Sequence, residues 1–267
     1  MKRITLGLFA LLTTVSCGGV DAAPNSQPAT VSSDSSASLA MVEAAATEAV
    51  KAPAVKASIK GMIKFEGAAP EQKVIDMAAE ASCHKAGSER AGGPIKEEYI
   101  VVNDGGLANV VISISKGIKG KFEGTGSVDL RQEGCQYIPH VLALQAGQSI
   151  NIINDDGVVH NVHSYSKRNT AFNMAQPAGA PAIVKDMKRK DKMFPVKCDM
   201  HAWMNCQVVV FDHPYFTVSG ENGAFEMGDL PAGKYTITAE HEKLGSQTAK
   251  VTVGDSGSQE LNFTFKK

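Results

Sequence analysis

Alternating apolar and polar positions run along most of the chain from residue 58 onward. Residues 61–67 alternate in this way, and so do residues 98–102 and 108–114, which are separated by the turn sequence Asn-Asp-Gly-Gly at 103–106. The same pattern predicts later strands at residues 141–144, 149–154, 207–211, 215–218, 224–227, 234–239 and 249–253. Helical periodicity is scarce, so the pattern predicts an all-β protein made of β-sandwiches.

Two stretches depart from the strand pattern. Residues 75–81 are predicted to form a short helix before Cys83. Residues 167–197 hold Pro177, Pro181 and several lysines, and we expect them to form a long polar connection.

The first residues have the pattern of an export signal. A short basic segment precedes an apolar run at residues 4–15, which is too short for a membrane-spanning helix. The sequence Thr-Val-Ser-Cys at 14–17 resembles a bacterial lipobox. Residues 1–17 are therefore predicted to be a lipoprotein-type signal peptide, with lipid attached to Cys17. The alternative is ordinary cleavage nearby, for instance after Ala23, which would release a soluble protein.

Residues 18–57 are rich in Ala, Ser, Thr, Pro and Val and contain no aromatic side chain. We expect a disordered linker that tethers the folded part to a membrane through Cys17. The predicted location is the bacterial periplasm, with the protein anchored to a membrane. A soluble periplasmic or secreted protein is the alternative.

The composition limits the classes of partner. The chain has 267 residues, of which 43% are hydrophobic, enough for a substantial core, and its formal net charge is −1. No basic patch stands out in the sequence, so nucleic acid is not expected as a partner.

The strongest chemical signal is the motif Cys198-x2-His201-x2-Met204, with His160 upstream. Copper(I) prefers thiolate and thioether sulfur, whereas copper(II) tolerates imidazole. Two histidines, one cysteine and a weak axial methionine form the ligand set of a blue (type 1) copper site. Three of these ligands lie on one short loop and His160 comes from elsewhere, so the metal would join two parts of the chain. Binding requires deprotonated ligands and therefore releases protons.

These motifs resemble those of amicyanin, within the plastocyanin-like cupredoxin superfamily, over about residues 127–210. The resemblance implies a Greek-key β-sandwich that holds one type 1 copper. The ligands that it implies are His160, Cys198, His201 and Met204. It also implies that Asn161 ties the ligand loops together by hydrogen bonds, and that His163 is a neighbour of the copper and not a ligand.

The same resemblance implies an electron carrier that serves redox proteins as donor and acceptor, and not an enzyme. We expect the electron to pass through an exposed edge of His201, with Ala202 and Trp203 as part of an apolar docking patch. Trp203 is equally suited to a place in the core. Val159 and Ala202 stand where the family usually has proline, which bears on loop rigidity and reduction potential more than on copper binding.

Several other interpretations stay open. A disulfide between Cys198 and Cys206 would leave His201 as a surface residue, and a zinc site could also use Cys and His. Copper storage or delivery is the main alternative function, because soft thioethers bind Cu(I) and methionines are frequent between residues 174 and 204. A lipid-anchored binding module with a vestigial site is another alternative. An enzyme would need a second metal centre, for which the sequence offers no further histidine cluster.

Cys83 and Cys135 lie outside the metal motifs. An exported protein can hold disulfides, so we predict that these two cysteines pair. In the chain-entropy account, closing so long a loop stabilises the fold by ~4 kcal/mol.

The C-terminal part of the chain has a second family pattern. The sequence S-x3-G-x-F-x4-LP-x-G-x-Y at 219–235 resembles carboxypeptidase regulatory-like (transthyretin-like) β-sandwiches, which are binding or scaffold modules. That pattern normally begins with a strand such as residues 61–65. We therefore predict an N-terminal β segment (58–120), a cupredoxin domain (121–212) and a regulatory-like segment (213–267). The first and third would form one sandwich into which the second is inserted.

Overall fold

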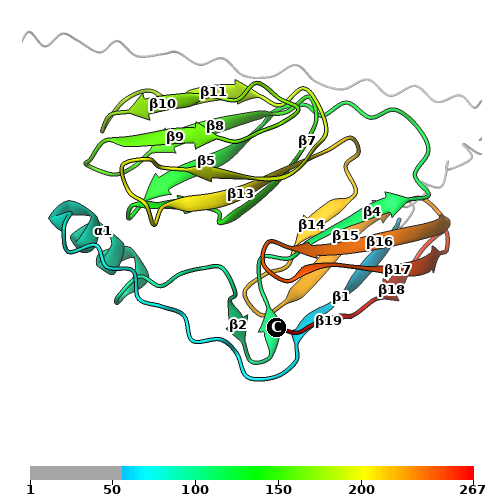
Figure 1. Cartoon of the computed structure of the whole chain (residues 1–267). Helices are drawn as coiled ribbons and strands as arrows, with labels where there is room; N and C mark the ends of the chain where they lie inside the picture. Colours follow the sequence, from blue (N-terminus) through cyan, green and yellow to red (C-terminus); the bar gives the residue numbers. More distant parts are fainter. Residues whose placement is uncertain (1–55) are drawn as a thin grey trace, which may run out of the picture. The chain divides into compact units, whose positions relative to one another are not determined.

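The computed structural model describes residues 56–267 (Figure 1). The predicted signal peptide, the lipidation site Cys17 and nearly all of the predicted linker lie outside these residues. Strands dominate the described part, which contains a single α-helix, so the all-β prediction is confirmed. Within the described part, no helix combines the length and the apolar character needed to cross a bilayer.

The N-terminal and C-terminal parts of the described chain together form a β-sandwich, which we call the split lobe. Strand β1 runs antiparallel to β15, with Gly61 opposite Phe225, and parallel to β19, with Ile63 opposite Phe263. The first sheet therefore combines strands from both parts, as a split sandwich requires. Its strands are β1 (Ala57–Phe65), β2 (Val102–Asn103), β3 (Gly106–Leu107), β15 (Ala224–Leu230), β18 (Ser258–Glu260) and β19 (Phe263–Phe265).

The second sheet of the split lobe also takes strands from both parts of the chain. Alternate residues of β16 are buried, namely Tyr235, Ile237 and Ala239, because successive side chains of a strand point to opposite faces. These residues share one apolar cluster with Ile59 and Phe265 of the first sheet. The strands of the second sheet are β4 (Val111–Lys116), β14 (Phe216–Val218), β16 (Gly233–His241) and β17 (Gly245–Val253).

Residues 121–212 form a second sandwich, which we call the inserted lobe. One of its sheets has the strand order β10-β9-β12-β13-β7, and the other has the order β11-β8-β5-β6. Ile150 and Ile152 of β8 and Val208 and Val210 of β13 belong to one buried apolar cluster. The strands are β5 (Ser127–Glu133), β6 (Gln136–Ile138), β7 (Val141–Gln145), β8 (Ser149–Asn154), β9 (His160–Ser164), β10 (Asn173–Gln176), β11 (Ile183–Asp186), β12 (Asp191–Lys197) and β13 (Asn205–Phe211).

The prediction that residues 167–197 form a long polar connection is wrong, because this stretch contains the strands β10, β11 and β12. Polar and charged side chains hide these strands in the sequence. In β12, Asp191 is buried beside Phe194 and Val196, and the pairing with β13 shifts register between Asp191 and Phe194. A broken register interrupts the period-2 pattern on which the prediction depends.

Two smaller predictions are also wrong. The helix is α1 (Ala81–Ala91) and not residues 75–81; it buries only Cys83 and Gly87, so no apolar stripe marks it in the sequence. Of the strand predicted at 98–102, only the last residue lies in β2. The β2–β3 turn has φ values of 49° at Asp104 and 79° at Gly105, the conformation for which the Asp-Gly pair is suited.

Residues 74–97, which we call the cap, pack against the inserted lobe. Cys83 of α1 forms the disulfide predicted from the sequence with Cys135 of the β5–β6 turn, with a Cα–Cα distance of 5.4 Å. Met77 and Ile95 form a small buried cluster around the two half-cystines. This part of the N-terminal segment therefore belongs with the inserted lobe and not with the split sandwich.

Candidate metal centre

The candidate ligand side chains of the inserted lobe lie at the start of one strand and on one loop of its first sheet. His160 is the first residue of β9, and the loop of residues 198–204 joins β12 to β13. Strands β9 and β12 are antiparallel, and Lys197 pairs with His163. Because β12 ends at that pair, the next residue, Cys198, enters its loop beside the start of β9.

Three predicted ligands meet in the interior. His160 Nδ1 lies 3.0 Å from His201 Nδ1, and Cys198 Sγ lies 3.6 Å from the same His201 nitrogen. The ligand atoms of all three residues lie within 4.8 Å of one another, and all three residues are buried. Two imidazole nitrogens and one sulfur that converge in this way suit a trigonal copper site.

Met204, the fourth predicted ligand, is buried at the end of the same loop. The Cys198 amide donates to the Met204 carbonyl (3.0 Å), and the Met204 amide donates to the His201 carbonyl (2.9 Å). These bonds hold Cys198, His201 and Met204 on one closed turn. The donor set is thus the soft and borderline mixture that copper accepts in both oxidation states.

Asn161 links β9 to the loop of residues 198–204 by hydrogen bonds, which is the role that the resemblance to amicyanin implies for it. Its backbone amide points at Cys198 Sγ (3.5 Å). Its side-chain oxygen accepts from the Asp199 amide, and its Nδ2 donates to the Asp199 carboxylate (3.2 Å). Hydrogen bonds of this kind orient ligands and support a thiolate.

Asp156 is a residue of the site that the sequence analysis missed. Its carboxylate lies 2.8 Å from His160 Nε2 and accepts from the amides of Gly134 (2.7 Å) and Cys135 (2.9 Å). A carboxylate on the outer nitrogen of a ligand histidine fixes the tautomer and the orientation of the ring. The available signal is an acidic residue four positions before His160. Cys135 also lies near Asp156 and His160, but its sulfur is in the disulfide.

The electrostatics of the site favour a thiolate at Cys198. Burial by itself would raise the pKa of Cys198, but hydrogen bonds from His160 and from the Asn161 amide outweigh it and lower the pKa. Burial and the nearby His160 lower the pKa of His201. Burial also opposes the charge on His160, yet Asp156 and Cys198 raise its pKa overall. Relative to the free side chains, the site thus shifts Cys198 towards the thiolate, the form that binds a metal, and shifts His160 towards the imidazolium, whose proton has to leave before a metal binds.

The expectation that one edge of His201 is exposed is wrong. His201 is only 5% exposed, and its Nε2 lies 3.8 Å from Cys83 Sγ beneath α1. The physical reason is that the cap, anchored by the Cys83–Cys135 disulfide, occupies the space where that edge would meet solvent. Trp203 is half-buried and packs against both Cys135 and the core of the inserted lobe.

The remaining cysteines and histidines have other surroundings. Cys198 and Cys206 do not form a disulfide; Cys206 is fully buried, and burial raises the pKa of its thiol. His163 faces Asp199 (3.0 Å) and stacks on Tyr165, away from the ligand cluster. Three other histidines are buried outside that cluster: His140, His213 and His241.

Comparison with protein families finds a match to the carboxypeptidase regulatory-like domain over residues 203–266. A search of curated proteins finds no match. The matched region contains β13 to β19, and so includes the C-terminal part of the split lobe.

Comparison with solved structures finds copper proteins. A Cu-containing nitrite reductase (NirK) from Thermus scotoductus SA-01 is 15% identical with a TM-score of 0.30, over 38% of this chain and 26% of its own length. An amicyanin mutant in the Cu(I) form is 18% identical with a TM-score of 0.28, over 37% of this chain and 97% of its own. A purple cupredoxin from Nitrosopumilus maritimus is 19% identical with a TM-score of 0.27, over 32% and 99%. The chain thus spans about a quarter of the length of the nitrite reductase. It is similar to carboxypeptidase regulatory-like domains in one region and to cupredoxins over about a third of its own length.

Proposed function

We propose that this protein holds one type 1 copper and transfers electrons outside the cytoplasm. The observation that carries the proposal is the buried convergence of His160 Nδ1, His201 Nδ1 and Cys198 Sγ, with Met204 on the same closed turn. Copper bound by this set would alternate between Cu(I) and Cu(II) and so accept and give one electron.

The chain's own residues supply the other requirements of such a carrier. Asn161 and Asp156 hold the ligand side chains in place by hydrogen bonds, so little needs to move when the charge of the metal changes. Burial keeps water away from the sulfur of Cys198. We assign no substrate-transforming role, and the partners are a donor and an acceptor redox protein.

Visible and electron-spin-resonance spectra of the protein loaded with one equivalent of Cu(II) test the proposal. An intense thiolate-to-copper band with a narrow copper hyperfine splitting is expected. A pale protein with a wide splitting would mean that no copper–thiolate bond forms, and the electron-transfer function would be abandoned.

The proposed location is the periplasmic side of a bacterial membrane, with lipid on Cys17. It is supported by the export pattern of residues 1–17. In cells that express the whole chain, the protein should be found in the membrane fraction, and Cys17→Ala should move it to the soluble fraction. Membrane association that survives Cys17→Ala would contradict lipidation at this residue.

Copper delivery is the second candidate function. Met200 lies in the loop of residues 198–204, which we call the ligand loop, and is 54% exposed. Met174 of β10 is 38% exposed. The residues before them, Asp199 and Asn173, are hydrogen-bonded to each other (2.8 Å). Thioethers at the surface suit the transfer of Cu(I). If Met200→Leu slows the transfer of Cu(I) to a chelator but leaves the visible spectrum unchanged, delivery is favoured over electron transfer; an unchanged transfer rate would argue against it.

A further inference from the structure

The cap covers His201, the ligand through which we expected the electron to pass. The Nε2 edge of His201 faces the buried sulfur of Cys83, and the imidazole is 5% exposed. A docking protein therefore cannot touch this edge while the cap is in place. An electron that is exchanged through His201 therefore has to pass through a group that contacts its ring.

The cap is a packed element. Gly87 of α1 lies close against Ile95 and the β5–β6 turn. A Cβ at this position would lie 2.5 Å from Ile95 Cδ1 and 3.1 Å from the Gly134 carbonyl oxygen. The guanidinium of Arg90 also donates to the side chain of Gln136. Together with the disulfide, these contacts fasten α1 to the β5–β6 turn on both sides of Cys135.

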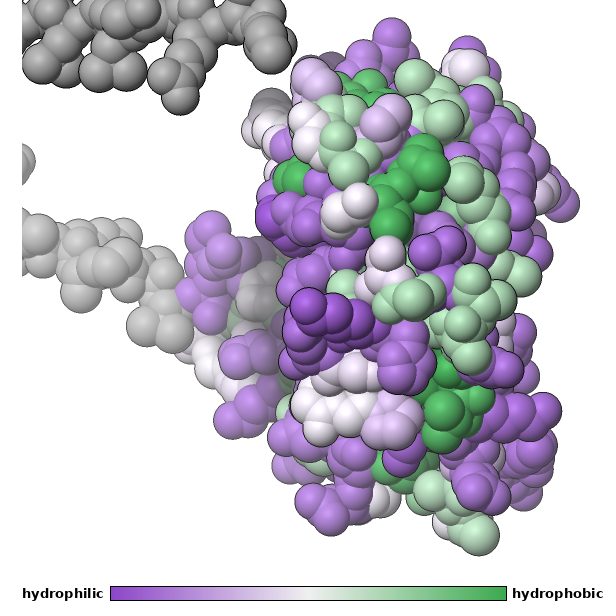
Figure 2. All heavy atoms as spheres, turned by 90° about the vertical axis from the view of Figure 1, so that its left-hand side faces the viewer, coloured by the Kyte–Doolittle hydropathy of each residue, from purple (hydrophilic) through white to green (hydrophobic). Residues whose placement is uncertain are grey.

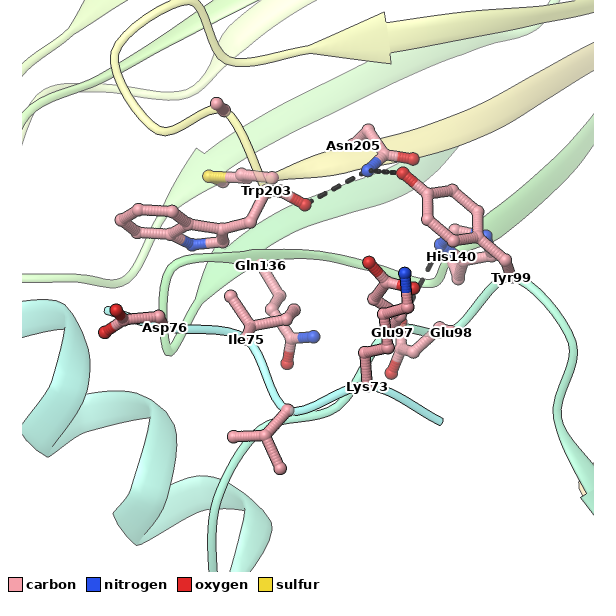
Figure 3. Close-up of a pocket in the computed structure, with 13 residues that line it drawn as sticks. Lys73, Ile75, Asp76, Glu97, Glu98, Tyr99, Gln136, His140, Trp203 and Asn205 are labelled. Carbon is pink, nitrogen blue, oxygen red and sulfur yellow. Dashed lines mark hydrogen bonds and ion pairs between the residues drawn. The ribbon is translucent and has the colours of Figure 1, made fainter. Parts of the chain in front are cut away.

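Trp203 is the aromatic ring that connects His201 with the surface. Its indole is tilted by 35° against the His201 imidazole, with ring centroids 5.3 Å apart. The indole Nε1–H donates to the Cys135 carbonyl (3.2 Å), which fixes the ring in this position. Trp203 is half-buried, and its ring also lines a pocket (Figure 3).

This pocket, which we call the Trp203 pocket, has a volume of about 360 Å³ and lies between the ends of the cap and the ligand loop. Figure 3 shows the indole of Trp203 and the ring of Tyr99 at opposite ends of it, with carboxylates below them. Its charged residues are Lys73, Asp76, Glu97 and Glu98, so carboxylates outnumber cations. Glu98 has His140 as a neighbour (3.7 Å), whereas neither Asp76 nor Glu97 forms an ion pair within the described residues.

The surroundings of the pocket are mixed in polarity. Val74, one of its lining residues, is 59% exposed. Figure 2 shows the side of the molecule on which α1 lies in Figure 1, and the described hydrophobic residues there form separate groups among hydrophilic ones. A small apolar contact surrounded by acidic residues suits a partner with a charged surface better than a partner with a broad apolar surface.

We propose that the Trp203 pocket is the electron-exchange surface of this protein, and that it fits a basic redox protein whose electron passes along Trp203 to His201. This inference rests on the proposed copper function. The carboxylates of Asp76 and Glu97 would steer a cationic partner to the pocket, and Val74 would supply apolar contact. The indole is the ring nearest to the ligand that such a partner can reach.

Quenching of fluorescence in the metal-free protein tests the pocket without copper, because Trp203 is the single tryptophan of the chain. Relative to the quenching of free N-acetyltryptophanamide by the same ions, caesium should quench Trp203 more strongly than iodide. The double variant Asp76→Asn, Glu97→Gln should remove this preference, while Glu226→Gln, Glu260→Gln in the split lobe should keep it. Equal quenching by both ions on this relative scale in the unmodified protein would overturn the acidic character of the surface.

Electron transfer from the Cu(I)-loaded protein tests the route. Each Cu(I) loses one electron to one tris(phenanthroline)cobalt(III) cation, which becomes cobalt(II), or to hexacyanoferrate(III), which becomes hexacyanoferrate(II). Asp76→Asn, Glu97→Gln should slow the reaction with the cation about tenfold at low salt and leave the reaction with the anion no slower. High salt should reduce the difference.

The role of Trp203 itself is tested with both oxidants. Trp203→Leu should slow both reactions severalfold with the copper–thiolate band intact, and Trp203→Phe, which retains a ring, should restore most of the rate. A protein with the band but with unchanged rates in Trp203→Leu and in the acidic double variant would overturn this inference alone. A protein without the band would instead overturn the proposed function.

Discussion

The two lobes bury different kinds of residue. The core of the split lobe is an apolar cluster that includes Ile59, Ile237 and Phe265. The inserted lobe also has an apolar cluster, but it buries most of the polar side chains that the described residues bury, including Gln132, Asp156 and Asp191. Burial of polar groups costs free energy unless they are hydrogen-bonded. The difference therefore separates a lobe that is organised around a chemical site from a lobe that is stabilised by apolar packing.

The Cys198→Ser variant tests the chemical side of this comparison and has the largest expected effect. Without the thiolate sulfur, the copper–thiolate band should disappear completely, whereas the hydroxyl fits the same volume and the far-ultraviolet circular dichroism should stay the same. Cys206→Ala is the matched control. It removes the other free thiol of the inserted lobe, should keep the band, and should lower the free energy of unfolding by about 1 kcal/mol. A band that survives Cys198→Ser would refute the assignment of the thiolate.

The Ile237→Ala variant tests the scaffold side. Ile237 is fully buried in β16, and truncation of a buried aliphatic side chain costs about 2–5 kcal/mol. We expect that loss in a denaturant titration, and an unchanged copper spectrum below the unfolding transition. Thr236→Ala, at the neighbouring half-buried position, should cost much less. Loss of the spectrum in folded Ile237→Ala would show that the split lobe shapes the copper site.

The Asp191→Asn variant tests whether the buried polar groups of the inserted lobe stabilise that lobe. The Asp191 carboxylate accepts from Ser166 Oγ (2.7 Å) and from the Lys167 (3.0 Å) and Arg168 (2.8 Å) amides. Burial opposes its charge, but these hydrogen bonds outweigh burial and lower its pKa from 3.8. Removal of the charge should cost about 2 kcal/mol at neutral pH.

The pH dependence of this cost follows from the sign of the shift. Because the folded-state pKa of Asp191 is lowered, its stabilisation is complete above the ordinary carboxyl pKa of 3.8 and is lost as the pH falls through the folded-state pKa. The difference in unfolding free energy between the two proteins should therefore be constant above about pH 5 and shrink in acid. The exposed Asp129→Asn serves as the control. A difference that grows in acid would contradict this account.

The smallest expected effect belongs to the surface of the split lobe. Asp229 lies 3.4 Å from Lys56, and both side chains are mostly exposed. Exposed ion pairs contribute little, so Asp229→Asn should change the free energy of unfolding by less than about 0.5 kcal/mol. Asparagine also tolerates the φ of 59° at this position. A larger loss in a denaturant titration would mean that surface charge matters more in the split lobe than its apolar core suggests.

Most strands with a clear alternating pattern could be predicted from the sequence. β7, β8 and β16 lie within a few residues of their predicted positions, because one face of each is buried and the period-2 pattern is strong. β12 could not be predicted, since its buried Asp191 and its register shift break the pattern. The helix α1 could not be predicted at its true position either, because it is held by a disulfide and a close glycine contact and not by an apolar stripe.

The sequence by itself determined the donor atoms of the site, because the spacing of Cys198, His201 and Met204 places three donors on one loop, and it also indicated the pairing of Cys83 with Cys135. Only the tertiary structure brought Asp156 onto His160 and the cap onto His201. Both contacts join segments through packing and hydrogen bonds that leave no periodic signal in the chain. The spacing of residues thus specifies which atoms can bind a metal, whereas the route by which a partner can reach that metal depends on what folds over it.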